Sequence, residues 1–494
     1  MPDSPPPVPR PDRGGRFLAP EGWLWGVASS AFQSEGFARA DGKGPSVWDH
    51  WLGDLRLAGP GVDGAVATRS YDRDVYRADM ALLRAATGAN AYRFSVSWPR
   101  VMPEGVGEAN ERSLAHYRRV ALDAREAGME PLPTLYHWDL PLALHRRGGW
   151  ASRESVGWFA AYAAACHRAL GDVAPRVVLL NEPLVETALG LRCEALAEGR
   201  EPGPEASPPA EAAFGRSLRE YNHKLLAAAA AARAWRGAGY AGALGLALAL
   251  GPCLPADPAS AADAAAARLA DGVVNRFFLD ALLRGSYPAD VLDRARALGA
   301  AGEHGIGDGD AEAVGAAGLG GGPGGFVGVN YYAPGWYRHD PSATGRHLVS
   351  EFDPPGEELA LNGACRPDML LALLRRLRDE YGNPPVLVTE NGAAFDDPEE
   401  ERVRADGTVN DARRCRYLAA HALAALEAAR EGCGVRGYFA WAGLDNLEWL
   451  RGAEGARYGL VRVDFATQAR TPKRSAAVYA AIARGEEPPP GLAA

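Results

Sequence analysis

Two short apolar runs each end in an acidic side chain, and a pair of such acids can do chemistry. Residues 386–388 (VLV) lead into Glu390, and residues 176–180 (RVVLL) lead into Glu182. Apolar runs without alternation are typical of strands buried on both faces of a parallel sheet. Ligands bind at the carboxyl ends of such strands. Two carboxylates at one such edge are the minimum set for cleaving a glycosidic bond.

Strands and helices must alternate along the chain to bring these acids together. Apolar runs predict strands over 23–30, 91–97, 130–136, 176–181, 243–250, 326–332, 386–391 and 435–441. Helical periodicity predicts helices over 72–86, 114–127, 152–170, 218–236, 271–283, 367–381 and 411–431. Ser152 and Ser217 are the expected N-caps of two of them. This alternation predicts an α/β protein, a single (β/α)₈ TIM barrel with extended βα loops forming the mouth of the site.

The chain contains no composition shift that would divide the barrel into separate domains. We expect a flexible, proline-rich leader over 1–20, one domain over 21–484 and a tail over 485–494. Two segments interrupt the alternation: residues 198–209 are rich in Pro and Glu, and residues 305–325 are rich in Gly. Both are candidates for walls of the mouth, and the second is equally compatible with a mobile surface insertion.

The composition excludes several classes of function. A net charge of −9 gives no basic surface for nucleic acid or an anionic membrane. No apolar stretch approaches the roughly 20 residues that cross a bilayer, and residues 1–20 lack the apolar segment of a signal peptide, which predicts a cytoplasmic protein. No His or Cys spacing indicates a metal site. Six cysteines without CxxC spacing are expected to be free thiols: Cys166, Cys193, Cys253, Cys365, Cys415 and Cys433.

Several segments, taken in chain order, resemble signatures of the family 1 glycoside hydrolases, the β-glucosidase and β-galactosidase family. They are WLWGVASSAFQSEG, DGKGPSVWD, YRFSVSWPRVMPEG, YHWDLP, LLNEP, VNRFFLDALLRGSYP, VGVNYY, VTENG and YFAWAGLDNLEW. The resemblance extends from about Trp23 to Tyr479. It implies a (β/α)₈ barrel, a retaining mechanism and no cofactor, so that residues 21–484 form the catalytic domain.

The resemblance assigns different roles to the two acids. Glu182 matches the family's acid/base and Glu390 matches its nucleophile. Glu182 must start protonated to assist the leaving group, and burial or the charge of the other acid would raise its pKa. Glu390 must start ionised and form a covalent glycosyl-enzyme, after which Glu182 activates water. Retention requires the two carboxyl groups to lie about 5–5.5 Å apart.

Other residues match positions that support the acids or bind the sugar. Asn181 matches a donor to the sugar 2-OH, while Tyr332 and Arg93 match groups that keep Glu390 charged and oriented. Asn330 matches a further polar support. The expected substrate-binding set also includes Gln33, His137, Trp138, Trp441, Glu448 and Trp449. A pyranose needs such acceptors for its hydroxyls and aromatic surfaces for its C–H face.

Glu448 carries information about the substrate. The phospho-glycosidase branch of the family has a small residue there, so a Glu favours an unphosphorylated sugar. The predicted function is therefore a retaining exo-β-glycosidase that hydrolyses terminal, non-reducing β-D-glucosides. β-Galactosides and β-fucosides are further candidates, and the first-contact residues do not choose between them. Its expected partner is this small-molecule β-glycoside alone.

Two alternatives share the same fold. One is a transglycosylating β-glycosidase, in which a sugar or alcohol replaces water. The other is a sugar-binding protein that has lost activity, which the presence of both Glu182 and Glu390 disfavours. The sequence leaves the natural aglycone open, and it leaves open whether the protein is a monomer or a homo-oligomer.

Overall fold

Eight parallel strands close into a barrel in the computed structural model, which describes residues 18–59, 64, 67–199, 210–299, 304–321, 324–341 and 349–487. Their order around the barrel is β1-β13-β12-β7-β5-β4-β3-β2. The strands are β1 (Leu24–Ala28), β2 (Ala91–Ser95), β3 (Glu130–Tyr136), β4 (Arg176–Asn181), β5 (Ala243–Ala249), β7 (Gly325–Asn330), β12 (Val386–Asn391) and β13 (Val435–Trp441). This arrangement confirms the predicted (β/α)₈ barrel, and all eight predicted strands are present.

The barrel interior is filled by an apolar layer of side chains. Its members are Leu24, Ala91, Leu132, Val178, Ala247, Phe326, Leu387 and Phe439, with one residue from each barrel strand. Two large rings fit in this layer because a glycine on a neighbouring strand lies against each of them. A Cβ on Gly26 would meet the Phe439 ring at 2.0 Å, and a Cβ on Gly245 would meet the Phe326 ring at 2.8 Å. The glycines are thus required by packing.

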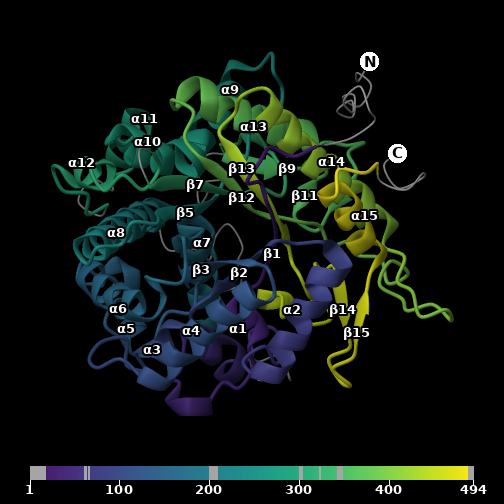
Figure 1. The fold of residues 1–494 in the computed structure, drawn as a ribbon. Helices are drawn as coiled ribbons and strands as arrows, with labels where there is room; N and C mark the ends of the chain where they lie inside the picture. The colour runs from purple at the N-terminus through teal and green to yellow at the C-terminus, as the bar shows by residue number, and fades with distance from the viewer. Residues whose placement is uncertain are drawn as a thin grey trace.

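Helices surround the barrel, as Figure 1 shows. The outer helices are α2 (Arg73–Thr87), α4 (Glu111–Glu126), α6 (Ser155–Leu170), α8 (Ala210–Gly237), α10 (Phe277–Arg284), α13 (Pro367–Glu380), α14 (Ala412–Arg430) and α15 (Arg474–Ala483). Local sequence signals explain where these helices begin and end. The Asp72 carboxylate accepts from Asp74 N at the start of α2, and Gly88 ends that helix with φ of 69°.

Three predicted helix features are wrong. Ser152 does not cap α6, because that helix begins later with Glu154 at its N-cap. Ser217 lies inside α8 and its hydroxyl donates to Ala213 O, since the alanine-rich helix starts a further two turns earlier, at Ala210. The predicted helix over 271–283 is divided: α9 (Ala261–Asp271) ends in a wider turn over Gly272–Arg276 before α10 begins.

Short elements after the barrel strands form the expected extended loops. The helices α1 (Ala31–Ser34), α3 (Trp98–Val101), α5 (Leu142–His145) and α7 (Pro183–Ala197) follow the first four strands. A three-stranded sheet joins β6 (Cys253–Pro255), β8 (Gly335–His339) and β9 (Val349–Phe352). Two further pairs are β10 (Leu359–Ala360) with β11 (Gly363–Ala364), and β14 (Val461–Val463) with β15 (Arg470–Pro472).

The glycine-rich segment differs from the expectation of a mobile mouth wall. After α11 (Ala289–Ala297), its described part contains α12 (Asp310–Gly315), which packs against α8 and α10 in the outer layer (Figure 1). Asp310 accepts from both Arg153 Nη atoms and from Asn222, and these bonds hold the helix in place. The described part of the segment therefore agrees with the alternative of a surface insertion and does not form a wall of the mouth.

Other expectations fall partly outside the described residues. These are most of the leader over 1–20, most of segment 198–209 and most of the tail over 485–494. All six cysteines are free thiols, as expected. In the part of the chain that the structure describes, no helix is long and apolar enough to cross a membrane.

Packing inside the barrel predicts opposite effects for one substitution at two sites. Gly26→Ala should lower the free energy of unfolding by about 1–3 kcal/mol, because the added methyl displaces the enclosed Phe439 ring. The control Gly157→Ala, on an exposed turn of α6 with no atom within 4 Å, should raise it by about 0.5–1 kcal/mol. Urea unfolding measures both values. Equal effects of the two substitutions would contradict this packing argument.

Candidate active site

Polar side chains meet above the apolar layer, at the carboxyl ends of the barrel strands. Arg93 comes from β2, Asn181 and Glu182 from the end of β4, Asn330 from β7, and Glu390 from β12. None of the five is more than 5% exposed. Glu390 and Asn330 are register partners on neighbouring strands. Because all these strands are parallel, their last residues point into one buried site.

Glu390 is held by a cation and a phenol. The guanidinium of Arg93 forms an ion pair with its Oε1, and Tyr332 Oη donates to its Oε2 at 2.8 Å. Burial and the charge of Glu390 raise the pKa of Tyr332 well above its usual value, which keeps the phenol protonated as a donor. Each oxygen of Glu390 thus accepts one strong hydrogen bond, and this fixes the plane of the carboxylate.

Arg93 is fixed by Asn181 and by two threonines that the sequence analysis did not select. Its Nε donates to Thr134 Oγ1 at 3.0 Å and its Nη1 to the Thr389 carbonyl at 3.2 Å. Its Nη2 donates to Asn181 Oδ1 at 2.6 Å. Position alone could have indicated Thr389, which directly precedes Glu390. Thr134 has no comparable signal, because threonine is common in any strand.

Glu182 stands where strand β4 turns into helix α7. Its φ of 45° is in the left-handed region, a conformation that costs about 1–3 kcal/mol for a residue with a side chain. Glu182 N donates to Ala247 O at 2.8 Å, and Pro183 begins the helix. Lys224 from α8 anchors the first turn, donating to Pro183 O at 3.2 Å and to Thr187 Oγ1 at 2.6 Å. The strained turn aims the acid at the barrel axis.

The surroundings of Glu182 favour its protonated form. Burial is the main cause that raises the pKa of this carboxyl, and the negative charge of Glu390 raises it further. A hydrogen bond from Asn330 Nδ2 to Glu182 Oε1, at 2.7 Å, opposes these effects without reversing them. Because Oε1 accepts this bond, Oε2 remains to carry the proton. The two buried acids therefore have unequal environments, and that of Glu182 favours the protonated form.

The amide of Asn181 has a defined orientation. Its Oδ1 accepts from Arg93 Nη2 and from Asn330 Nδ2, the latter at 3.0 Å. Asn330 is oriented in turn because its Oδ1 accepts from Thr389 Oγ1 at 2.7 Å. The Nδ2 of Asn181 therefore points away from Arg93, and it lies 3.3 Å from His137 Nε2. An amide held in this way presents a donor to the site.

Aromatic rings form one side of the site. His137 is stacked with Trp441 at a centroid distance of 5.6 Å, and Trp138 lies 4.6 Å from Trp449. Burial and the nearby Arg93 lower the pKa of His137 well below its usual value, so its ring is neutral. Trp138 Nε1 donates to Asn181 O at 3.0 Å. These rings supply flat apolar surface beside hydrogen-bonding groups, which is the combination that a pyranose requires.

Gln33 and Glu448 come from loops on the same side of the barrel. Gln33 Nε2 donates to Leu447 O at 2.8 Å, and Gln33 Oε1 accepts from Ser30 Oγ at 2.6 Å. Glu448 follows Leu447 directly. Burial raises the pKa of Glu448 to about 7, against the lowering effect of Arg451, and the charge of Glu390 adds to the rise. The structure thus brings all twelve residues selected from the sequence into one region.

Similarity to known proteins extends along nearly the whole chain. The model of glycosyl hydrolase family 1 matches residues 16–488. β-Glucosidase A of Enterobacter agglomerans is 46% identical over 470 residues, covering 94% of this chain and 95% of that protein. A bifunctional β-D-glucosidase/β-D-fucosidase of Bifidobacterium breve is 34% identical, covering 93% and 96%. The family 1 β-glucosidase structure from Thermotoga maritima is 34% identical, with a TM-score of 0.82 and coverage of 95% and 98%.

The coupling between the two acids predicts a titration result. In Glu390→Gln, the pKa of Glu182 should fall relative to wild type, because the larger of the two negative charges that raise it is removed, but burial should keep it above the ordinary value. The protonated fraction of Glu182 at neutral pH then decreases. Carbon-13 NMR titration of labelled glutamates measures this shift. The control Glu448→Gln should give a smaller fall, and equal shifts in the two variants would contradict the ranking.

Proposed function

The chain belongs to glycosyl hydrolase family 1, and from this premise we propose that it is a retaining exo-β-glycosidase acting on terminal β-D-glucosides. The observation that carries the proposal is the unequal environment of two buried carboxyls. Glu390 is bound by Arg93 and Tyr332, whereas Glu182 accepts from the neutral amide of Asn330. Unequal environments are what one acid and one nucleophile require at the same pH.

Glycosylation begins with the protonated Glu182. Its proton passes to the glycosidic oxygen as the bond to the anomeric carbon breaks, while an oxygen of Glu390 forms a bond to that carbon. The aglycone leaves with the proton, and the sugar remains as an ester of Glu390. Asn181 Nδ2 donates to the 2-OH, a contact that strengthens as positive charge develops on the ring.

Deglycosylation uses the same two residues, but now Glu390 is uncharged and Glu182 is ionised. Once Glu390 is esterified, its negative charge no longer raises the pKa of Glu182, which therefore falls. The ionised Glu182 takes a proton from water, the water oxygen bonds to the anomeric carbon, and the ester bond to Glu390 breaks. Two inversions give net retention, and the original protonation states return. A sugar or alcohol in place of water gives transglycosylation through the same step.

Residues of the predicted glycone pocket favour a neutral hexose. In this proposal Gln33 supplies an acceptor for a glycone hydroxyl, Glu448 accepts from the hydroxyls at C4 and C6, and Trp441 with its stacked partner His137 supplies an apolar face. With a pKa of about 7, Glu448 can ionise near neutral pH. This charge disfavours a 6-phosphate. The name of the Bifidobacterium relative, a bifunctional β-D-glucosidase/β-D-fucosidase, supports β-fucosides as additional substrates.

Hydrolysis of nitrophenyl glycosides tests the proposal. The wild-type enzyme should cleave the β-glucoside and the β-fucoside, should also be active on the β-galactoside, and should leave the α-glucoside intact. The 6-phosphorylated β-glucoside should be a poor substrate because of Glu448. Glu390→Ala should lose roughly 10⁴-fold or more of the rate. Azide should restore part of that rate and give an inverted product. No turnover by folded wild-type protein would instead support a sugar-binding role.

Removal of the acid should depend on the leaving group. Glu182→Ala should reduce kcat/KM about 10²–10⁴-fold for an alkyl β-glucoside, which needs a proton, and far less for a dinitrophenyl β-glucoside. Steady-state kinetics on the two substrates gives the comparison. Equal losses on both would remove Glu182 from the acid role and leave only a structural effect of the substitution.

A further inference from the structure

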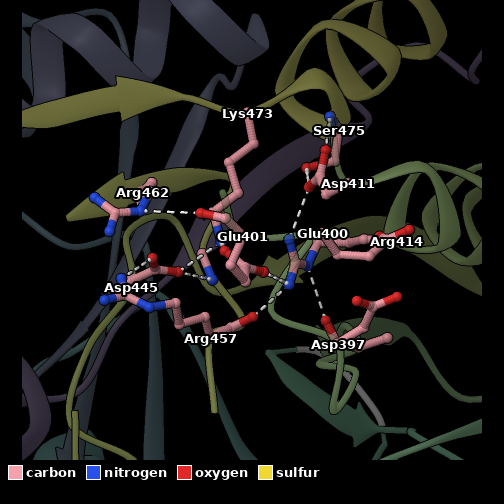
Figure 2. Close-up of polar contacts among 12 residues, drawn as sticks. Asp397, Glu400, Glu401, Asp411, Arg414, Asp445, Arg457, Arg462, Lys473 and Ser475 are labelled. Atoms are coloured by element: carbon pink, nitrogen blue, oxygen red, sulfur yellow. Dashed lines mark hydrogen bonds and ion pairs between the residues drawn. The ribbon is translucent and has the colours of Figure 1, made fainter. Parts of the chain in front are cut away.

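Six charged residues form a buried cluster beside the site, away from the catalytic acids. We call them the ionic cluster: Glu401, Asp411, Arg414, Asp445, Arg457 and Lys473 (Figure 2). Three carboxylates balance three cations, and no side chain in the cluster is more than 15% exposed. Buried charges of this kind persist only where each has a well-placed partner. The cluster therefore fixes the segments that carry it.

Asp445 closes the loop between β13 and β14. Its Oδ2 accepts from Arg457 Nη1 at 2.7 Å, and its Oδ1 accepts from Lys473 Nζ and Gly459 N, both at 2.9 Å. Burial raises the pKa of Asp445, but the charges of Lys473 and Arg457 outweigh burial and hold it below the usual value. An ionised Asp445 thus joins the start of the 444–459 loop to its end.

Arg414 connects this loop to the strand of Glu390. Its Nε donates to Ala393 O at 2.9 Å, and Ala393 lies three residues after Glu390. Its Nη1 donates to Asp411 at 2.7 Å, and its Nη2 donates to Arg457 O. One guanidinium therefore holds the end of β12 and the closing part of the 444–459 loop at a fixed separation.

The same loop carries Glu448 and is held from its other side by Gln33. Gln33 Nε2 donates to Leu447 O, and Leu447 N donates to Gln33 O at 3.0 Å. Glu448 N donates to Gly452 O at 3.0 Å within the loop. Glu448 therefore lies between two anchors: Gln33 at the inner side, and Asp445 with its cations at the outer side. Loss of the outer anchor removes one of the two restraints on the backbone that carries Glu448.

We propose that Asp445 is a positioning residue for sugar recognition, which fixes the 444–459 loop so that Glu448 meets the hydroxyls at C4 and C6 of the glycone. This inference rests on the proposed function, in which Glu448 accepts from the sugar. Asp445 acts through Lys473, Arg457 and the loop backbone. Its contribution depends on the glycone, because only sugars with the C6 hydroxyl use the full contact with Glu448.

Asp445→Asn tests this role with two substrates that differ at C6. The amide keeps the shape of the side chain but leaves Lys473 and Arg457 without their shared carboxylate. For nitrophenyl β-glucoside, kcat/KM should fall at least about tenfold, mainly through KM, because sub-ångström placement of Glu448 is lost. For nitrophenyl β-xyloside, which has no C6 hydroxymethyl group, it should fall less than about threefold. The glucoside-to-xyloside preference should therefore decrease.

Two further variants separate positioning from a general loss of structure. Asp310→Asn removes another buried carboxylate, one that accepts from Arg153 and Asn222 in the outer layer. It should lower thermal stability and leave the glucoside-to-xyloside preference unchanged. Lys473→Met leaves Asp445 its bonds to Arg457 and Gly459 N, and should decrease the preference in the same direction by a smaller factor. If Asp445→Asn does not fold, Lys473→Met is the variant that tests the positioning role of Asp445.

The outcomes distinguish this inference from the function on which it rests. A folded wild-type protein that cleaves neither substrate overturns the proposed function, and the role of Asp445 with it. An active wild type whose Asp445 variant loses rate equally on both substrates overturns the positioning role alone. If only Lys473→Met folds, an unchanged glucoside-to-xyloside preference in that variant also overturns the positioning role. A selective loss on the glucoside supports it.

Discussion

The ion pair between Arg93 and Glu390 is the constraint on which the site depends. A charge in the interior of a barrel is costly unless its partners are fixed, and removal of one partner leaves the other uncompensated. Here the guanidinium is fully buried and the carboxylate is 3% exposed. Thr134, Thr389 and Asn181 accept from three further N–H groups of Arg93. The polar layer is therefore one connected unit, resting on an apolar layer that includes Phe326 and Phe439.

The same connected unit explains why two glutamates at one site can differ in function. Arg93 serves Glu390 directly, but it reaches Glu182 only as a more distant charge whose effect is smaller than that of burial. Asn330 gives Glu182 a neutral donor where Glu390 has a cation and a phenol. In the proposed mechanism this asymmetry of environment distinguishes the acid from the nucleophile, and chemical modification of Glu390 removes one of the causes that raise the pKa of Glu182.

Much of this arrangement could be predicted from the sequence because strand ends are strongly marked. Continuous apolar runs ending in polar residues located β4 and β12 to the residue, and all eight barrel strands were found. Predictions failed where a local signal competed with tertiary packing. Ser217 has the residue type of a cap, yet the alanine-rich sequence before it continues α8. The ionic cluster joins residues 401 to 473, and its pairs depend on loop geometry that spacing does not encode. Thr134 was missed for a different reason, since threonine is common in any strand.

The number of carboxyls around the site limits how they can be charged. Glu182, Glu390 and Glu448 influence one another, while Arg93 is the cation bonded directly to one of them. Mutual repulsion and burial raise the pKa of the two acids that lack such a partner. Hydroxyls that donate to Glu448 favour its charged form, so a bound sugar should lower the pKa of that residue. Sugar binding and ionisation of Glu448 are then linked, and a loop held by Asp445 on one side and Gln33 on the other places this carboxyl where the link can operate.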